Sequence, residues 1–275
     1  SRDPEPSFYC TRILMLSYEW LPIAGALVGL VVGLTGVGGG ALMAPILLVG
    51  FGLDLATVVA TDLLFATVTK LAVTRVHHKN QFIDWQVTKR LWLGSIPATF
   101  FIVWLAQTGE LFASPDWVVQ LLGALVLLSA VSLLFGDRIQ ALQSARRTED
   151  PDRFLKIQPA LTILAGGIVG TLVTLTSVGA GALGAALLRA LYPLRMQAKR
   201  LVATDTIHAI PVSLFGGLGY LVLGLTNLNV LALLLLGSVP AAIFGGKLVA
   251  IAPVYFTRTV LGFVLCLAGL KLLLS

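Results

Sequence analysis

The sequence predicts an all-α, polytopic membrane protein made of two inverted-topology repeats of about five membrane segments each. Three observations predict this fold class: an apolar composition, an internal repeat, and a reversal of loop charge between the two halves. The 275 residues are 57% hydrophobic and 12% charged, with a mean hydropathy of +0.93. Soluble domains carry about 25% charged residues, whereas here apolar runs that can cross a bilayer recur from near Trp20 onward. The composition therefore excludes a soluble globular protein.

The internal repeat consists of three matches in the same order. LTGVGGGAL, beginning at Leu34, matches LTSVGAGAL, beginning at Leu175, at seven of nine positions. VATD at 59–62 recurs at Val202, and GSIPA at Gly94 recurs as GSVPA, each shifted by 143 residues. A fixed period of this kind indicates a tandem duplication. We expect a polar leader at 1–19, a first transmembrane repeat at 20–135, a linker at 136–156 and a second transmembrane repeat at 157–275.

Each half contains five apolar segments, and the second segment of each set is short. Crossing about 30 Å of hydrocarbon takes roughly 20 helical residues. We therefore expect half-length helices at 41–53 and 182–191, each following a glycine-rich break. The longer segments are expected at 20–37, 55–75, 91–107 and 117–135, and at 157–177, 201–223, 228–249 and 255–274.

Loop charge predicts the orientation of the halves. The loop after the second half-length segment carries Arg189, Arg195, Lys199 and Arg200, but its counterpart, GFGLD, has no basic residue. The bias reverses one segment later, where RVHHKNQFIDWQVTKR corresponds to GLTNLN. Basic loops favour the cytoplasm, so each loop and its counterpart are expected on opposite sides of the membrane. This places the linker 136–156 in the cytoplasm and both termini outside. The net charge of +6 then reflects topology rather than nucleic-acid binding.

The two breaks suit an anion. Dense glycines permit positive φ and bring backbone N–H groups close to a ligand, and the helix that follows directs its positive end to the break. Two such ends, opposed by inversion, would hold a small oxyanion near the midplane, as in secondary transporters. Close packing is the alternative for glycines spaced by four, and we expect it at Gly25, Gly29, Gly33, Gly166 and Gly170. The substrate-binding candidates are Thr35, Gly36, Gly38, Gly39 and Gly40 in the first break and Thr176, Ser177, Gly179 and Gly181 in the second.

GLTGVGGGALMAPIL, its degenerate second copy, the shared VATD and the chain length resemble the TauE/SafE family of sulfite and organosulfonate transporters, also called the toluenesulfonate uptake permease family. The resemblance runs from about Gly25 to Leu274. It implies export or uptake of sulfite or an organosulfonate, such as sulfoacetate or a taurine-derived sulfonate, across a bacterial inner membrane. The second copy departs from the first at Ser177 and Ala180, so we expect the two walls of the site to act differently.

Four ionisable residues inside the predicted segments are singled out here, since such residues are functional candidates by default. Asp62 and Asp205 occupy matching places, and each could bind and release a proton as access alternates or could shape the unwound glycine backbone. His208 shares a helix face with Asp205; it could relay a proton, donate to the anion, or be a satisfied interior histidine. Lys70 shares a face with Asp62 and could attract the anion or extend to the membrane interface.

These features favour a secondary active transporter for a small sulfur-containing anion, coupled to protons and working by alternating access. Pro97 and Pro240, at matching places in long segments, are predicted helix kinks and candidate hinges. An anion channel is the alternative, since opposed helix ends could also line a pore. An intramembrane aspartyl protease is a remote alternative, because its two aspartates would have to share a proton. We expect no enzymatic activity, cofactor, metal or nucleic acid; the expected partners are the small anion, the lipid bilayer and, in a homodimer, a second copy.

Overall fold

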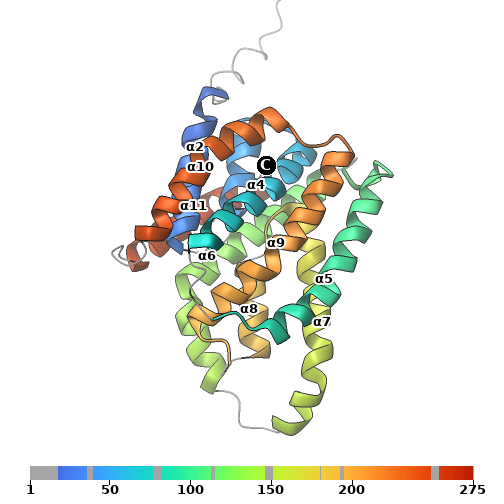
Figure 1. Cartoon of the computed structure of the whole chain (residues 1–275), viewed down its shortest axis with the longest axis vertical. Coiled ribbons are helices and arrows are strands. Elements are labelled where there is room, and N and C mark those ends of the chain that lie inside the picture. The colour runs from blue at the N-terminus through green and yellow to red at the C-terminus, as the bar shows by residue number, and fades with distance from the viewer. Residues whose placement is uncertain are drawn as a thin grey trace, which may run out of the picture.

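The computed structural model describes residues 18–35, 40–76, 82–112, 115–145, 151–179, 181–192, 195–248 and 254–274. Within these ranges the chain is helical and contains no strand (Figure 1). The elements are η1 (Tyr18–Trp20), α2 (Leu21–Thr35), α3 (Gly40–Pro45), the π-helix η2 (Ile46–Gly50), α4 (Leu55–Val76), α5 (Trp85–Ala106), η3 (Glu110–Phe112), α6 (Pro115–Ala145), α7 (Pro151–Thr176), α8 (Ala182–Leu191), α9 (Ala198–Val222), α10 (Leu228–Leu248) and α11 (Val254–Leu274).

Six helices in the described part of the chain are long and apolar enough to cross a membrane. These are α2 together with η1, α4, α6, α7, α9 and α10, and α4 is the most buried of them. Short helices lie at both places where half-length segments are expected, because α3 continues into η2 and α8 has only 10 residues. The prediction of an all-helical, polytopic membrane protein is therefore confirmed.

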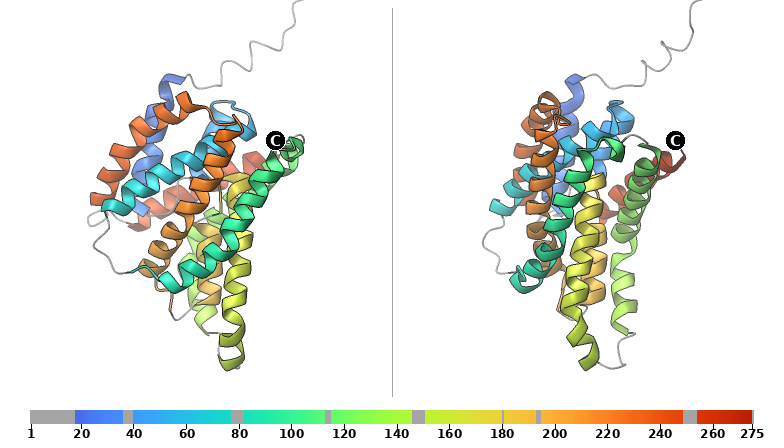
Figure 2. Two further views of the ribbon diagram at one scale, coloured as in Figure 1. Left: turned by 45° about the vertical axis from the view of Figure 1, so that its right-hand side comes forward. Right: turned by 90° about the vertical axis from the view of Figure 1, so that its right-hand side faces the viewer.

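Some helices extend beyond the predicted apolar segments, at places where polar residues favour a helix. α6 continues to Ala145 and α7 begins at Pro151, so much of the expected linker 136–156 is helical, and Figure 2 shows the two helices extending together at the lower end of the molecule. α5 begins at Trp85 rather than at residue 91, because the Asp84 side chain accepts a hydrogen bond from the Val87 amide and caps the helix. Hydropathy follows the membrane-spanning part of a helix and misses such polar turns.

Two pairs of helices cross at close range, α2 with α10 and α5 with α7 (Figure 1). A methyl group at Gly29 would overlap the backbone of Ser238, and one at Gly170 would overlap the backbone of Ser95. Both contacts join the two halves, and they occupy equivalent places in the repeat. The same overlap with partner backbone occurs at the other glycines predicted to pack, Gly25, Gly33 and Gly166. The packing role predicted from their spacing is therefore confirmed.

The repeat-related helices α4 and α9 pack against each other, and so do α6 and α11. α4 also contacts α10, and α9 contacts α5. The pair of α4 and α9 therefore joins the two crossed pairs, and most of its inward side chains are buried. The polar residues among them, described next, sit in this central position because their helices have apolar neighbours on several sides.

A buried polar centre at the break between α7 and α8

The break between α7 and α8 contains three residues with positive φ in a span of five. The φ angles are 58° at Ser177, 121° at Gly179 and 112° at Gly181. Such angles suit glycine but strain residues with a Cβ, and Ser177 is the one non-glycine residue with positive φ in the described part of the chain. Ser177 also stands where the first repeat has Gly36. The second break therefore carries a hydroxyl group at a position where the backbone conformation favours glycine.

The threonines at the ends of α2 and α7 bind backbone. The Thr176 hydroxyl lies 2.7 Å from the Leu172 carbonyl and accepts from the Val178 amide at 3.2 Å. The Thr35 hydroxyl donates to the Val31 carbonyl at 2.8 Å. In this arrangement both hydroxyls fix the ends of their helices. Gly36, Gly38 and Gly39 lie outside the described residues, and Gly40 begins α3.

Asp205, on α9, places its carboxyl group against the first turn of α8. A methyl group at Gly184 would overlap Asp205 Oδ1, so the missing side chain makes the hollow that receives the carboxylate. The Gly181 amide lies near the same carboxylate. Asp205 is 7% exposed, and its Oδ1 has no hydrogen-bond partner among the described residues. The start of α8 thus faces a negative charge that belongs to the protein itself.

Asp62, on α4, is the repeat counterpart of Asp205 and is fully buried. In the described part of the chain neither of its carboxyl oxygens has a hydrogen-bond partner. The Ser177 side chain lies beside the carboxyl group, but the two do not meet normal hydrogen-bond geometry, and the Ser177 hydroxyl is also buried and unpaired. Unpaired buried polar atoms are rare and costly. The Asp62 carboxyl group and the Ser177 hydroxyl are therefore candidates to bind a ligand.

Lys70, also on α4, lies at the polar centre and is 6% exposed. Its ammonium group interacts electrostatically with both Asp62 and Asp205. This burial favours a place for Lys70 at the polar centre over an extension to the membrane interface. A buried ammonium that attracts two buried carboxyl groups offsets part of the cost of desolvating them.

His208 joins the centre to α5. Its Nε2 lies 3.0 Å from the Ser95 hydroxyl, and its carbonyl accepts a hydrogen bond from the Trp92 indole at 3.1 Å. Nδ1 is buried and has no partner among the described residues. His208 is thus satisfied on one side, as an interior histidine, and unpaired on the other.

The structure brings together the four ionisable residues that the sequence selected, Asp62, Lys70, Asp205 and His208, with the candidates Ser177 and Gly181 from the break. The chemistry of this group is that of an anion site with its own acids: a lysine, a hydroxyl and a helix start attract negative charge, while two carboxyl groups resist it. Pro97 and Pro240 lie elsewhere, exposed on α5 and α10, and both helices continue through them.

Several polar residues were missed by the sequence reasoning. Thr67 donates to Ser213 across α4 and α9 at 2.9 Å, and Thr69 lies 3.4 Å from Ser238. The signal was present in Ser95 and Ser238, because both belong to the repeated GSIPA and GSVPA motifs and both lie at a crossing of two helices.

A second polar cluster surrounds Asp84, which precedes α5. Arg195, from the loop between α8 and α9, donates to Asp84 Oδ1 at 2.8 Å and pairs with Oδ2, and Arg200 lies 4.0 Å from the same carboxylate. The sequence reasoning treated these arginines only as topology signals. An acidic residue inside an otherwise basic loop is the feature that could have indicated the pairing.

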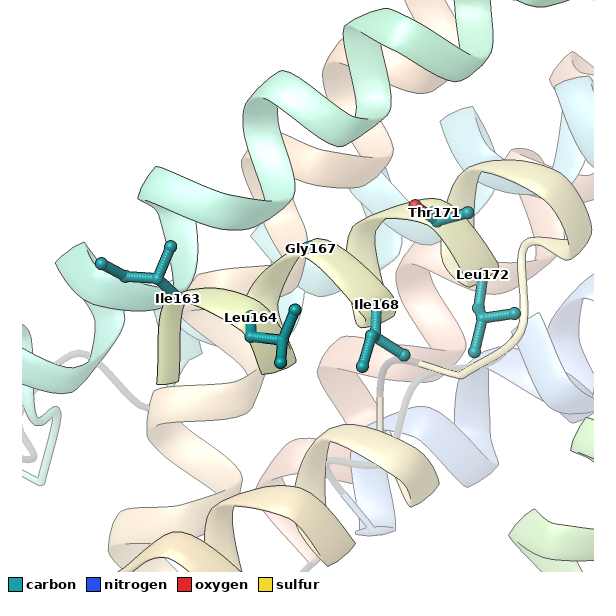
Figure 3. A pocket seen from close by; sticks show the side chains of 6 residues that line it. All are labelled: Ile163, Leu164, Gly167, Ile168, Thr171 and Leu172. Atoms are coloured by element: carbon teal, nitrogen blue, oxygen red, sulfur yellow. The ribbon is translucent and has the colours of Figure 1, made fainter. Parts of the chain in front are cut away.

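Figure 3 shows a hollow on the outer side of α7, lined by Ile163, Leu164, Gly167, Ile168, Thr171 and Leu172. Its lining is almost entirely apolar, and Leu164 is 61% exposed. Such a surface suits lipid chains rather than an anion. It therefore belongs to the membrane-facing surface and not to the polar centre.

Long apolar helices around a buried ionisable centre define an integral membrane protein of a transport type. The family model described as "Sulfite exporter TauE/SafE" matches residues 21–272, and the chain belongs to this family. "Probable membrane transporter protein YjnA" of Bacillus subtilis (strain 168) is 33% identical over 259 residues, which cover 91% of this chain and 98% of that protein. "Probable membrane transporter protein YdhB" of the same organism is 23% identical over 249 residues, covering 90% and 96%. No solved structure matches the chain.

Proposed function

We propose that this protein is a secondary active transporter that moves a small sulfur-containing anion, sulfite or an organosulfonate, across the bacterial inner membrane. The observation that carries the proposal is the buried group of Ser177, Lys70 and two aspartates at the start of α8, in a chain of the TauE/SafE family. An intramembrane lysine and a helix start attract an anion. Carboxyl groups beside them supply the proton coupling.

Alternating access between two inverted halves accounts for the way the helices pair. The crossing of α2 with α10 has a counterpart in the crossing of α7 with α5, and the contact of α4 with α10 has a counterpart in that of α9 with α5. Each of these helix contacts thus recurs between the repeat counterparts of the two helices, which is the pattern expected when two similar halves are related by a two-fold axis. Inverted repeats of this kind support rocking of one half against the other around a central site.

The proposed orientation follows from loop charge. The linker 136–156 and the basic loop that holds Arg195 face the cytoplasm, and both termini face the periplasm. Asp84 and its arginine partners then lie on the cytoplasmic side of the polar centre.

The test is uptake of labelled sulfite, taurine, sulfoacetate and chloride into proteoliposomes under imposed proton gradients. We expect saturable, gradient-driven flux of at least one sulfur anion. Flux of chloride alone, or no flux of any sulfur anion, would contradict the proposal. Flux that neither saturates nor follows the proton gradient would instead support the anion channel, because opposed helix ends could line an open pore.

A matched pair of lysine variants tests the site. Lys70→Gln removes the buried ammonium, and we expect transport of the sulfur anion to fall at least about tenfold, the effect of about 1.4 kcal/mol. Lys89→Gln changes an exposed lysine on α5 and should transport as the wild type does. Equal transport by the folded Lys70→Gln variant would remove Lys70 from the anion site.

A further inference from the structure

We propose that the Asp205 carboxylate is a tethered anion that competes with the transported anion for the start of α8. This inference rests on the proposed function and assigns one residue the role of coupling the anion to the proton. The carboxylate binds the helix start when the site is empty, and it must be protonated before a substrate anion can take its place.

The first step of the argument is steric. The carboxyl group of Asp205 fills the hollow left by the missing side chain of Gly184, in the first turn of α8. The Gly181 amide, at the start of the same turn, lies near the carboxylate. A sulfonate or sulfite oxygen would need the same amides and the same hollow, because a helix start offers its free N–H groups only there. The two anions therefore exclude each other.

The second step concerns charge. The titratable groups around Asp205 are Lys70 and Asp62 on α4 and His208 on its own helix, while α8 presents backbone and α5 presents Ser95 to His208. With Lys70 charged and both aspartates ionised, the group carries a net negative charge. A further anion would raise that charge in a water-poor interior, where it is costly. One proton on Asp205 removes its charge, so its neutral carboxyl no longer competes for the helix start.

The third step is a difference between the two aspartates. Asp205 lies against glycine backbone at a helix start, whereas Asp62 lies beside the Ser177 hydroxyl with neither oxygen paired in the described part of the chain. Only Asp205 is therefore placed to compete at α8. Anion entry would leave Asp205 as a carboxylic acid, and anion release on the other side would let it lose the proton and bind the helix again.

The experiment measures binding of labelled sulfoacetate to the purified full-length protein from mildly acidic to mildly alkaline pH, where the probe keeps its charge. Wild-type affinity should fall with rising pH, by up to about tenfold per pH unit for one competing proton. Asp205→Asn, a neutral variant of the same shape, should bind equally well across the range and should exchange sulfoacetate without proton-driven accumulation. Asp62→Asn should keep the pH slope, and so should Asp116→Asn, which changes an exposed aspartate.

Gly184→Ala provides a second test that keeps the acid. Its methyl group fills the hollow that the carboxylate and the substrate oxygen would share, so the affinity for sulfoacetate should fall at every pH although Asp205 is present. A wild-type slope in folded Asp205→Asn, or loss of its binding at every pH, would overturn the inference. Failure of the wild type to bind or move any sulfur anion would instead count against the proposed function itself.

Discussion

The two repeats differ in the regions that follow their short helices. After α8, Tyr192 bonds to Thr162 at 2.7 Å and accepts from Arg90 at 3.3 Å, and the loop arginine Arg195 pairs with Asp84. We call this group of five residues the polar closure. It joins the start of α5, the side of α7 and the end of α8, which come from both halves of the chain.

The equivalent region in the first repeat is apolar. Phe51, which follows η2 as Tyr192 follows α8, lies in the apolar core with Leu21, the counterpart of Thr162. Leu233 stands in place of Arg90, and Asn227 stands in place of Asp84. Asn227 caps α10 by accepting from the Val230 amide at 3.1 Å but carries no charge. We call the three apolar residues, Leu21, Phe51 and Leu233, the apolar closure.

This difference shows which region can open at lower cost. When the polar closure opens, its hydrogen bonds and its partly exposed ion pair are replaced by contacts with water. Each of them therefore contributes only about 0.5–1.5 kcal/mol net to keeping the region closed. Opening the apolar closure exposes hydrocarbon at about 25 cal/mol per Å². The two halves therefore pack in similar ways but are held together by different kinds of contact, and in the proposed access cycle hydration of the polar closure would be the easier step.

The largest effect should come from breaking what the two regions share, the crossed helix pairs. Gly29→Val and Gly170→Val each drive a side chain into the backbone of the partner helix, which cannot move aside as a side chain can. We expect each variant to lose about 3 kcal/mol or more, or to fail to fold, as followed by thermal unfolding in detergent. Gly167→Ala is the matched control, since its added methyl would meet its nearest neighbour at 3.8 Å. A tolerated valine at either position would show that the pairs are not closely packed.

The next largest effect on stability should distinguish the two helix caps, Asp84 before α5 and Asn227 before α10. Asp84→Ala removes a helix cap and leaves Arg195 without its carboxylate, so we expect a loss of about 2–3 kcal/mol of stability. Asn227→Ala removes a cap alone and should cost about 1 kcal/mol. Thermal unfolding of both variants in the same detergent gives the comparison. Equal losses would mean that the ion pair adds nothing to the polar closure.

The smallest effect should come from removing one hydroxyl. Tyr192→Phe makes the second repeat resemble the first and deletes the bonds to Thr162 and Arg90, at a cost of about 1 kcal/mol. The Thr162 hydroxyl keeps its bond to the Gln158 carbonyl, which limits the loss. We expect slightly lower thermal stability and a changed rate of sulfur-anion transport. No change in either measurement would show that the polar closure acts through the ion pair only.

Much of the fold was predictable because runs of high hydropathy give the lengths of membrane helices, and regularly spaced small residues mark where two helices are in contact. The apolar segments and the packing glycines at Gly29 and Gly170 were predicted from these signals. The polar start of α5 was not, because its cap depends on one aspartate rather than on an apolar run.

The site was predictable in its residues but not in its contacts. Asp62, Lys70 and Asp205 stood out as charges in apolar segments. Spacing along one helix could not show that Lys70 interacts with aspartates from both repeats, nor that the start of α8 faces Asp205. These are long-range contacts, and they depend on how α4, α8 and α9 pack together.

Ser177 has a consequence for protein engineering. Its positive φ costs about 1 kcal/mol or more relative to glycine, because a Cβ crowds the backbone there. A screen for heat-resistant variants would therefore favour glycine at this position and would discard the hydroxyl that faces Asp62. In the proposed site, thermostability and transport make opposite demands on this residue, so a variant stabilised there for structural work would be a poor one in which to test the proposal.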